Sequence, residues 1–272
     1  MMRSLWSAAS GMKGQQIAVD TIANNIANVN TTAFKSQSTQ FKTLLYQTLE
    51  ATSTNGNGET KPTSAQVGLG TRVASLNANF TQGAMTAVES NTAFCINGDG
   101  FFAIQGEDGE TYYTRNGNFG WALDDTGARV LTTPEGYKLL DRDGKAISIP
   151  AAAGTDGFTV GDDGECSYRD ADGRYVKTGQ YVALYQFGNR VGLEKLGENL
   201  YAETTASGEP MSEWNTQNIT RSEIAQGYLE GSNVNVADEM VNLIVSQRAY
   251  ELNSKAITTS DTMLEQANNL KR

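Results

Sequence analysis

Gly98 and Gly100 come nearest in this chain to a nucleotide-binding pattern, because they open the spacing Gly-x-Gly-x-x-Ala that ends at Ala103. In dinucleotide-binding folds this pattern leads into a helix, and the N-terminus of that helix holds a pyrophosphate. The residues after Gly100, FFAIQGEDGE, are instead typical of a short strand and a turn. We therefore interpret the two glycines as part of a tight turn and predict no nucleotide cofactor.

Two acidic turns, at residues 141–144 and 170–173, resemble parts of a calcium-binding loop. When either turn is aligned on its glycine, the first ligand position falls on Leu139 or Tyr168, and neither side chain can bind calcium. Both segments are interpreted as turns, and no metal site is predicted.

The remaining candidates for catalysis are the carboxylate pairs at residues 124–125 and 162–163, and the chain also has two thiols, Cys95 and Cys166, which cannot form a zinc site alone. The chain has no histidine, which removes the commonest general base and metal ligand. The carboxylates stand in Gly-flanked turns, whereas acid–base catalysis needs a carboxylate in a desolvating pocket. The thiols are expected to be small buried side chains, and sequence alone leaves a disulfide open. We predict no catalytic residue, no enzyme activity and no small-molecule substrate.

The charge of the chain argues against one class of partner. The net charge is −10, and residues 91–175 hold 15 acidic and 7 basic side chains. Nucleic-acid binding requires clustered Lys and Arg residues. No nucleic-acid partner is predicted.

A heptad pattern predicts a first helix over residues 4–28. The segment is rich in Gly and Ala, so this helix is weak alone but can approach another helix closely. Gln15 interrupts an otherwise apolar or small-residue seam. The apolar repeat consists of Leu5, Met12, Val19 and Ile26, with Ala8, Ile22 and Val29 beside it.

A second helix is predicted over residues 236–270, where two apolar stripes indicate two packing partners. Asn233 or Asn235 can cap its start, and the acidic Asp238 and Glu239 favour its first turn. The first stripe is Val236, Leu243, Tyr250, Ile257 and Leu264, and the second is Val241, Val245, Leu252, Ala256, Met263, Ala267 and Leu270.

Between the helices the pattern changes to that of a β-rich segment. Residues 50–70 are polar and bounded by glycine, which predicts an extended or mobile stretch. From residue 71 to 229, short apolar runs alternate with Asp-Gly and Asn-Gly dipeptides, which are hairpin signals. The predicted strands are Thr71–Phe80, Phe101–Gln105, Tyr112–Arg115, Arg129–Thr132, Tyr137–Leu140, Phe158–Val160 and Tyr181–Phe187.

These elements predict an α+β fold with a discontinuous helical stem. Residues 1–30 and 236–272 are expected to pair in a coiled-coil-like manner, residues 31–70 to connect, and residues 71–235 to form an all-β, antiparallel, hairpin-rich middle domain. Pairing the helices leaves the second stripe of the last helix for another copy. The same periodicity also allows an ordinary helical hairpin packed on the sheet. The predicted assembly interface is Leu5, Met12, Val19, Ile22, Ile26, Val236, Met240, Leu243, Tyr250, Ile257 and Leu264.

The N-terminal sequence lacks the apolar run of a cleavable secretory signal, and no stretch approaches the length of a membrane span. We expect a protein that either stays inside the cell or leaves it by a route that needs no such signal.

The N-terminal segment ANNIANVNTTAFK, residues 23–35, resembles the hallmark of the flagellar axial family of rod, hook and hook-associated proteins. One departure is Ala33, where the family commonly has Gly, and a left-handed turn at this position would strain an alanine. The positions that match the family motif are Asn24, Asn25, Ala27, Asn28, Thr31, Phe34 and Lys35.

The C-terminal segment 226–264 is similar to the same family through SNVNV, MVNLI, QRAYE and NSKA. NGDGFFAI, YTRNGNF and GLEKLGENLYAETTASGEP also have counterparts there, so the resemblance covers nearly the whole chain and is closest to the distal rod subunits. Residues 46–70 occupy the place of an extra segment that, in the family, is thought to lock neighbouring subunits into a straight tube.

The resemblance implies a structural subunit of the bacterial flagellar basal body, in the cell envelope, that self-assembles into a straight hollow shaft and transmits torque from motor to hook. It implies a homopolymer with the terminal helices innermost, and export by the flagellar type III apparatus without a cleavable signal peptide. The implied partners are proximal rod subunits, the hook protein and surrounding ring proteins. The alternatives are another axial subunit, such as a proximal rod or hook protein, a secreted β-rich binding module, or a secreted hydrolase with an unusual site.

Overall fold

The computed structural model describes residues 2–50, 64–124, 127–150, 154–170, 173–216 and 219–270. It divides the chain into two compact units, which we call the helical unit and the β unit. No helix in the described residues is both long enough and apolar enough to cross a membrane. The helical unit comprises Met1–Ala27, Gln37–Asn79 and Asn235–Arg272, and the β unit comprises Asn28–Ser36 and Phe80–Val234.

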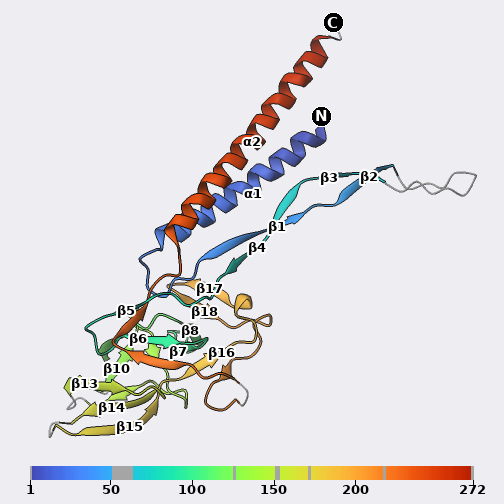
Figure 1. The fold of residues 1–272 in the computed structure, drawn as a ribbon. Helices are drawn as coiled ribbons and strands as arrows, with labels where there is room; N and C mark the ends of the chain where they lie inside the picture. The colour runs from blue at the N-terminus through green and yellow to red at the C-terminus, as the bar shows by residue number, and fades with distance from the viewer. Residues whose placement is uncertain are drawn as a thin grey trace, which may run out of the picture. The chain divides into compact units, whose positions relative to one another are not determined.

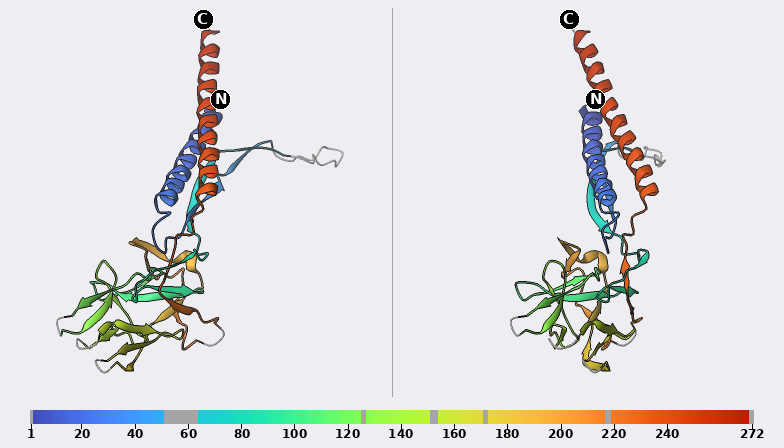
Figure 2. Two further views of the ribbon diagram at one scale, coloured as in Figure 1. Left: turned by 60° about the vertical axis from the view of Figure 1, so that its left-hand side comes forward. Right: turned by 90° about the vertical axis from the view of Figure 1, so that its left-hand side faces the viewer.

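The two predicted helices are confirmed, and they lie antiparallel beside each other in the helical unit (Figures 1 and 2). Contacts at both ends fix this direction. The hydroxyls of Ser4 and Ser260 are 3.3 Å apart, and Asn25 Nδ2 donates to Glu239 Oε1 at 3.0 Å. The helices are α1 (Met2–Ala27) and α2 (Val236–Asn269).

The start of α2 is set by Asn235 rather than by Asn233. Asn235 Oδ1 accepts the backbone N–H of Ala237 at 3.1 Å, and its Nδ2 donates to Asp238 Oδ2 at 2.7 Å. The carboxylates of Asp238 and Glu239 in the first turn also interact favourably with the positive end of the helix dipole, which stabilises the start of the helix. Asn233 instead belongs to the β unit, where its Oδ1 accepts the N–H of Ser36 at 2.8 Å.

Two antiparallel strand pairs complete the helical unit. Gly14 of α1 allows β1 (Gln37–Thr43) to approach the helix closely, because a Cβ at this position would lie 3.0 Å from the ring of Phe41 in that strand. Sequence reasoning predicted an extended stretch over 50–70 but missed this pairing, and residues 51–63 of that stretch lie outside the described residues. The pairs are β1 with β4 (Thr71–Ala78), and β2 (Tyr46–Glu50) with β3 (Ala65–Gly68).

The β unit confirms the predicted antiparallel middle (Figure 1). Its strands are β5 (Met85–Ala87), β6 (Phe94–Asn97), β7 (Phe101–Gln105), β8 (Thr111–Thr114), β9 (Gly120–Leu123), β10 (Arg129–Thr132), β11 (Lys138–Leu139), β12 (Ser148–Ile149), β13 (Gly154–Val160), β14 (Glu165–Arg169), β15 (Tyr175–Tyr181), β16 (Leu184–Gln186), β17 (Glu194–Gly197), β18 (Leu200–Ala202), β19 (Met211–Ser212), β20 (Glu223–Gln226) and β21 (Tyr228–Glu230).

The largest sheet of the β unit has ten strands. Its main path runs β12-β10-β11-β7-β8-β18-β17, with β9 beside β10, β16 beside β7 and β19 beside β16. A second sheet has the order β13-β14-β15, and β6 pairs with β20 while β5 pairs with β21. A short 3₁₀ turn spans Arg190–Gly192.

The prediction of one strand over Tyr181–Phe187 is wrong. Tyr181 ends β15, opposite Glu165 of the three-stranded sheet, whereas Leu184 begins β16, opposite Phe102 of the ten-stranded sheet. The apolar run passes from one sheet to the other, and its continuous hydrophobicity concealed the change of partner.

The core of the β unit is aromatic and aliphatic. The ring of Phe119 packs against two others, with its centroid 6.0 Å from that of Phe94 and 5.4 Å from that of Phe102. Cys95 and Cys166 are both buried free thiols, as expected. The segment after Gly100 is strand β7, so the glycine pattern leads into a strand and not into a helix.

The two thiols predict how stability depends on pH. Burial raises the pKa of Cys166 to about 12 and that of Cys95 to about 11, from an ordinary value of 9.0. Between pH 9 and 11 the folded state therefore holds more protons than the unfolded state. The free energy of unfolding should fall as pH rises through this window, by up to about 1.4 kcal/mol per pH unit for each thiol.

Replacing Cys166→Ala should isolate this contribution. Below pH 9 the variant should be less stable by about 1 kcal/mol because a buried sulfur is lost. From pH 9 to 11 its stability should decline less steeply than that of the wild type, as measured by urea unfolding at a series of pH values. Parallel curves across this window would contradict the assignment.

Candidate assembly interface

The two stripes of α2 lie in different surroundings. Leu243, Ile257 and Leu264 of the first stripe are half-buried in the helical unit, on the side of α2 that meets α1. The second stripe faces solvent along the length of the helix. Its large members are exposed: Val241 59%, Val245 61%, Leu252 68% and Met263 53%.

The predicted interface residues differ in burial between the two helices. On α1, Ile22 is buried, and Leu5, Met12, Val19 and Ile26 are half-buried. On α2, three predicted residues are more exposed than a fully packed seam requires: Val236, Met240 and Tyr250. The helix pair therefore covers the α1 stripe only in part and leaves Val236, Met240 and Tyr250 of α2 exposed.

Sequence reasoning missed a polar series on the seam of α2. Glu239, Ser246, Asn253 and Ser260 recur every seven residues, and Ser246 is buried. Asn253 lies against Gly11 of α1, where a Cβ would be 3.0 Å from its Nδ2. The signal was present in the sequence, because each of these residues stands four positions before a member of the first stripe.

A groove of about 410 Å³ opens between the two helices. Val19 of α1 and Tyr250 of α2 supply its apolar surface, and Gln16, Gln247 and Glu251 form its polar edge. The groove is an uncovered part of the same seam, which an apolar side chain can fill.

In the first part of the family motif, one residue, Asn25, connects two elements of the helical unit. Asn25 is fully buried at the end of α1, where its Nδ2 donates to Gln37 O at 2.8 Å and its Oδ1 accepts Gln37 N–H at 2.9 Å. Its amide therefore satisfies both backbone groups of the first residue of β1. Asn24 and Ala27 lie on the exposed side of α1.

The second part of the motif forms a turn in the β unit. Thr31 Oγ1 donates to Asn28 Oδ1 at 3.1 Å, and Phe34 N–H donates to Thr31 O at 3.3 Å. Phe34 is buried, with Lys195 Nζ 4.7 Å from the centroid of its ring. Ala33 adopts a positive φ of 56°, so the chain keeps the left-handed turn although the position holds alanine and not glycine.

Lys35, the last motif residue, belongs to a buried ion cluster. Its Nζ lies 2.5 Å from Glu230 Oε1 and donates to Thr81 O at 2.8 Å. Arg115 Nε is 3.3 Å from Glu230 Oε2. All three charged side chains are almost completely buried, and Gly83 N–H also donates to Glu230 Oε1 at 3.0 Å.

The electrostatics of this cluster are unbalanced, because one carboxylate faces two cations. Burial lowers the pKa of Lys35 most strongly, and Arg115 lowers it further, while Glu230 acts in the opposite direction. Arg115 also donates to Gly98 O, but its Nε and Nη1 make no hydrogen bond among the described residues. Glu230 is therefore the group on which both buried cations depend.

The chain resembles known proteins along its whole length. The family profile "Flagella basal body rod protein" matches residues 5–35. The profile "Flagellar hook protein FlgE/F/G D1 domain" matches residues 95–168, and "Flagellar basal body rod FlgEFG protein C-terminal" matches residues 225–270.

Full-length relatives give the same result. The chain is 44% identical to the flagellar basal-body rod protein FlgG of Borreliella burgdorferi, with 100% of both chains covered. It is 42% identical to the FlgG protein of Buchnera aphidicola subsp. Schizaphis graminum, over 99% of this chain and 100% of the relative. It is 40% identical to the FlgG protein of Bacillus subtilis, with 100% of both chains covered.

Glu230→Gln should destabilise the protein strongly. The amide keeps the size of the side chain but leaves Lys35 and Arg115 buried without a counter-charge, at a cost of about 3–5 kcal/mol in the free energy of unfolding. Urea unfolding of the full chain measures this effect. Glu165→Gln, which removes the exposed pair with Lys177, is the matched control and should change stability little. Equal effects of the two substitutions would contradict the role of the cluster.

Proposed function

The chain belongs to the FlgG family of flagellar basal-body rod proteins, and we propose that it polymerises by covering the exposed stripe of α2 with helices of neighbouring copies. It is a structural subunit of the distal rod and not an enzyme. The proposed polymer is the straight hollow shaft that transmits torque from the motor to the hook.

One observation carries this proposal. Val241, Val245, Leu252 and Met263 expose a continuous apolar stripe on a helix whose other face already meets α1. A large exposed apolar surface on a folded chain indicates a protein–protein contact. A helical polymer supplies that contact in every copy, because each subunit offers one surface and covers another.

The stem of this polymer is proposed to be coiled-coil-like. Leu243, Tyr250, Ile257 and Leu264 recur every seven residues on the α1 side of α2, which is the period of a left-handed helical pair. Residues 1–30 and 236–272 would form the inner core, residues 31–70 the connection and residues 71–235 the outer domain. The small residues of α1 allow the close approach that such a core needs.

The strand pair β2–β3 offers a second contact surface. Leu45, Tyr46 and Leu49 are exposed on or beside β2, with Leu45 at 83%. We place these side chains against neighbouring subunits, where they would hold the tube straight. Residues 46–70 would then be the rod-specific segment, of which residues 51–63 lie outside the described part.

The further partners follow from the place of a rod in the basal body. We propose contacts with proximal rod subunits, the hook protein and the surrounding ring proteins, in the cell envelope. Export through the flagellar type III apparatus would deliver the subunit without a cleavable signal peptide.

Charges on the exposed stripe should stop assembly without unfolding the monomer. The double variant Val245→Asp, Leu252→Asp loses the burial of two apolar side chains, each contributing about 1.5–3 kcal/mol, and buries charge instead. The critical concentration for tube formation should rise at least ~100-fold, as measured by sedimentation and electron microscopy. Thr258→Asp, an exposed α2 position outside both stripes, is the matched control. Normal tubes from the double variant would contradict the proposal.

The β2–β3 surface should affect the shape of the tube more than its formation. Replacing Leu45→Ser and Leu49→Ser removes exposed apolar side chains, so the monomer should keep its stability. Electron micrographs should show tubes that bend more than those of the wild type. Gln47→Ser, on the same strand, should leave the tubes straight. Straight tubes from the Leu45/Leu49 variant would show that this surface does not keep the tube straight.

A further inference from the structure

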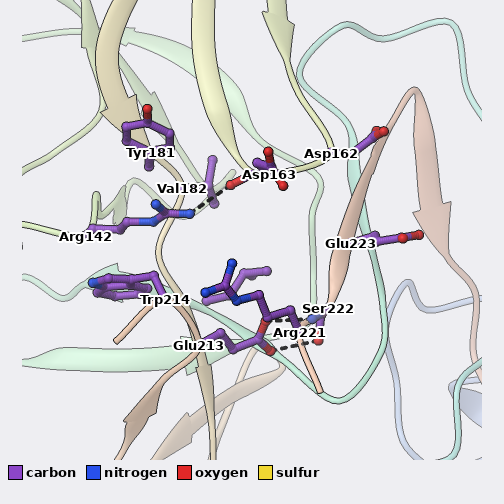
Figure 3. A pocket seen from close by; sticks show the side chains of 11 residues that line it. Arg142, Asp162, Asp163, Tyr181, Val182, Glu213, Trp214, Arg221, Ser222 and Glu223 are labelled. Carbon is purple, nitrogen blue, oxygen red and sulfur yellow. Dashed lines mark hydrogen bonds between the residues drawn. The ribbon is translucent and has the colours of Figure 1, made fainter. Parts of the chain in front are cut away.

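The β unit contains a pocket of about 390 Å³ that the proposed helical contacts do not use (Figure 3). It opens between the turn before β14, the end of β15 and the segment that precedes β20. The residues that decide its chemistry are Arg142, Asp163, Tyr181, Trp214, Arg221 and Glu213.

Arg142 is fixed in place as a charged wall of the pocket. Its guanidinium carbon lies 4.3 Å from the centroid of the Tyr181 ring and 5.4 Å from that of Trp214. Its Nη2 donates to Asp163 O at 2.9 Å, while its buried Nε makes no hydrogen bond among the described residues. The stacked rings orient the guanidinium and leave donor capacity on it.

Arg221 brings a second guanidinium to the same side. It is exposed, and it has no ion-pair partner in the part of the chain that the structure describes. Its side chain points toward the side of the pocket occupied by Arg142 and Trp214 (Figure 3). The two guanidinium groups repel each other when the site is empty. An oxyanion bound between them would accept a charge-assisted hydrogen bond from each and offset this repulsion.

The carboxylates of the lining do not neutralise the two arginines. Glu213 accepts the N–H of Ser222 at 2.7 Å and its hydroxyl at 2.8 Å. Asp162 and Glu223 point away from the guanidinium groups (Figure 3), and Asp163 meets Arg142 through its carbonyl oxygen. Asp162 and Glu223 make the far rim negative, which disfavours a multiply charged anion relative to a single carboxylate.

We propose that this pocket receives an Asp or Glu side chain of a second copy of the chain, held between Arg142 and Arg221. The proposal rests on the polymer proposed above, in which every copy has neighbours. The chain itself is rich in suitable carboxylates, since it carries 31 acidic and 21 basic residues. Exposed acids stand at the turn between β7 and β8, at Glu107, Asp108 and Glu110. A pocket on one copy and an acid elsewhere on the next is a heterologous contact, the type that builds helical polymers.

Zero-length cross-linking tests the proposal on the full chain, with or without tube formation. Arg221→Lys keeps the positive charge and supplies an amine that carbodiimide joins to a carboxylate in direct contact. In a mixture of ¹⁴N- and ¹⁵N-labelled protein, mass spectrometry should find Lys at position 221 joined to an acidic residue of a differently labelled copy. Arg174→Lys, an exposed arginine outside the pocket, is the control. Coupling at position 221 only within one copy, or between copies no more than at position 174, would overturn the proposal.

A second measurement distinguishes a carboxylate of a second copy from a free oxyanion as the occupant of the pocket. Acetate and phosphate, compared with chloride at equal ionic strength, are titrated while the indole N–H signal of Trp214 is followed by NMR. A response that Arg221→Gln abolishes, together with an approximately tenfold higher critical concentration for this variant, supports a carboxylate from a second copy. The same response with unchanged assembly would show a site for free oxyanions and overturn the second-copy assignment. Failure of the wild type to form tubes would count against the polymer, while cross-linking still decides the pocket.

Discussion

The structure depends on a mismatch between the two terminal helices: α2 has two apolar stripes, and only the first of them packs against α1. The covered side is built from small residues on α1 and a polar heptad series on α2, which permits close approach. The uncovered side exposes Val241, Val245 and Leu252. A soluble monomer has little use for such a stripe, whereas a polymer subunit needs it, because its burial is available only to neighbouring copies.

The family motif stabilises the chain where its course changes. Asn25 binds both backbone groups of Gln37, so the end of α1 and the start of β1 are held by one amide. Lys35 and Arg115 share the carboxylate of Glu230 in the core of the β unit. Buried charges of this kind add little net stability, but removing one partner costs much. Asn25 and Lys35 of the motif therefore specify local geometry within the subunit.

Much of this could be predicted from the sequence. Heptad periodicity located α1 and α2 within two residues of their observed starts and ends, and turn dipeptides predicted the antiparallel middle. The strands β2 and β3 were missed because their polar residues lack alternation, and pairing across a long connection leaves no local signal. The pocket at Arg142 and Arg221 could not be predicted either, since residues 79 positions apart meet only through the fold. Periodicity was enough to propose interface residues. It could not predict which stripe of α2 stays exposed, because that depends on how α2 packs against α1.

If the subunit polymerises as proposed, the exposed stripe of α2 becomes buried between copies. A cryo-electron microscopy map of assembled tubes, at a resolution that places side chains, would show this. Val241, Val245, Leu252 and Met263 should then lie against helices of neighbouring subunits. A tube in which these side chains face solvent, with subunits joined only through their β units, would contradict it.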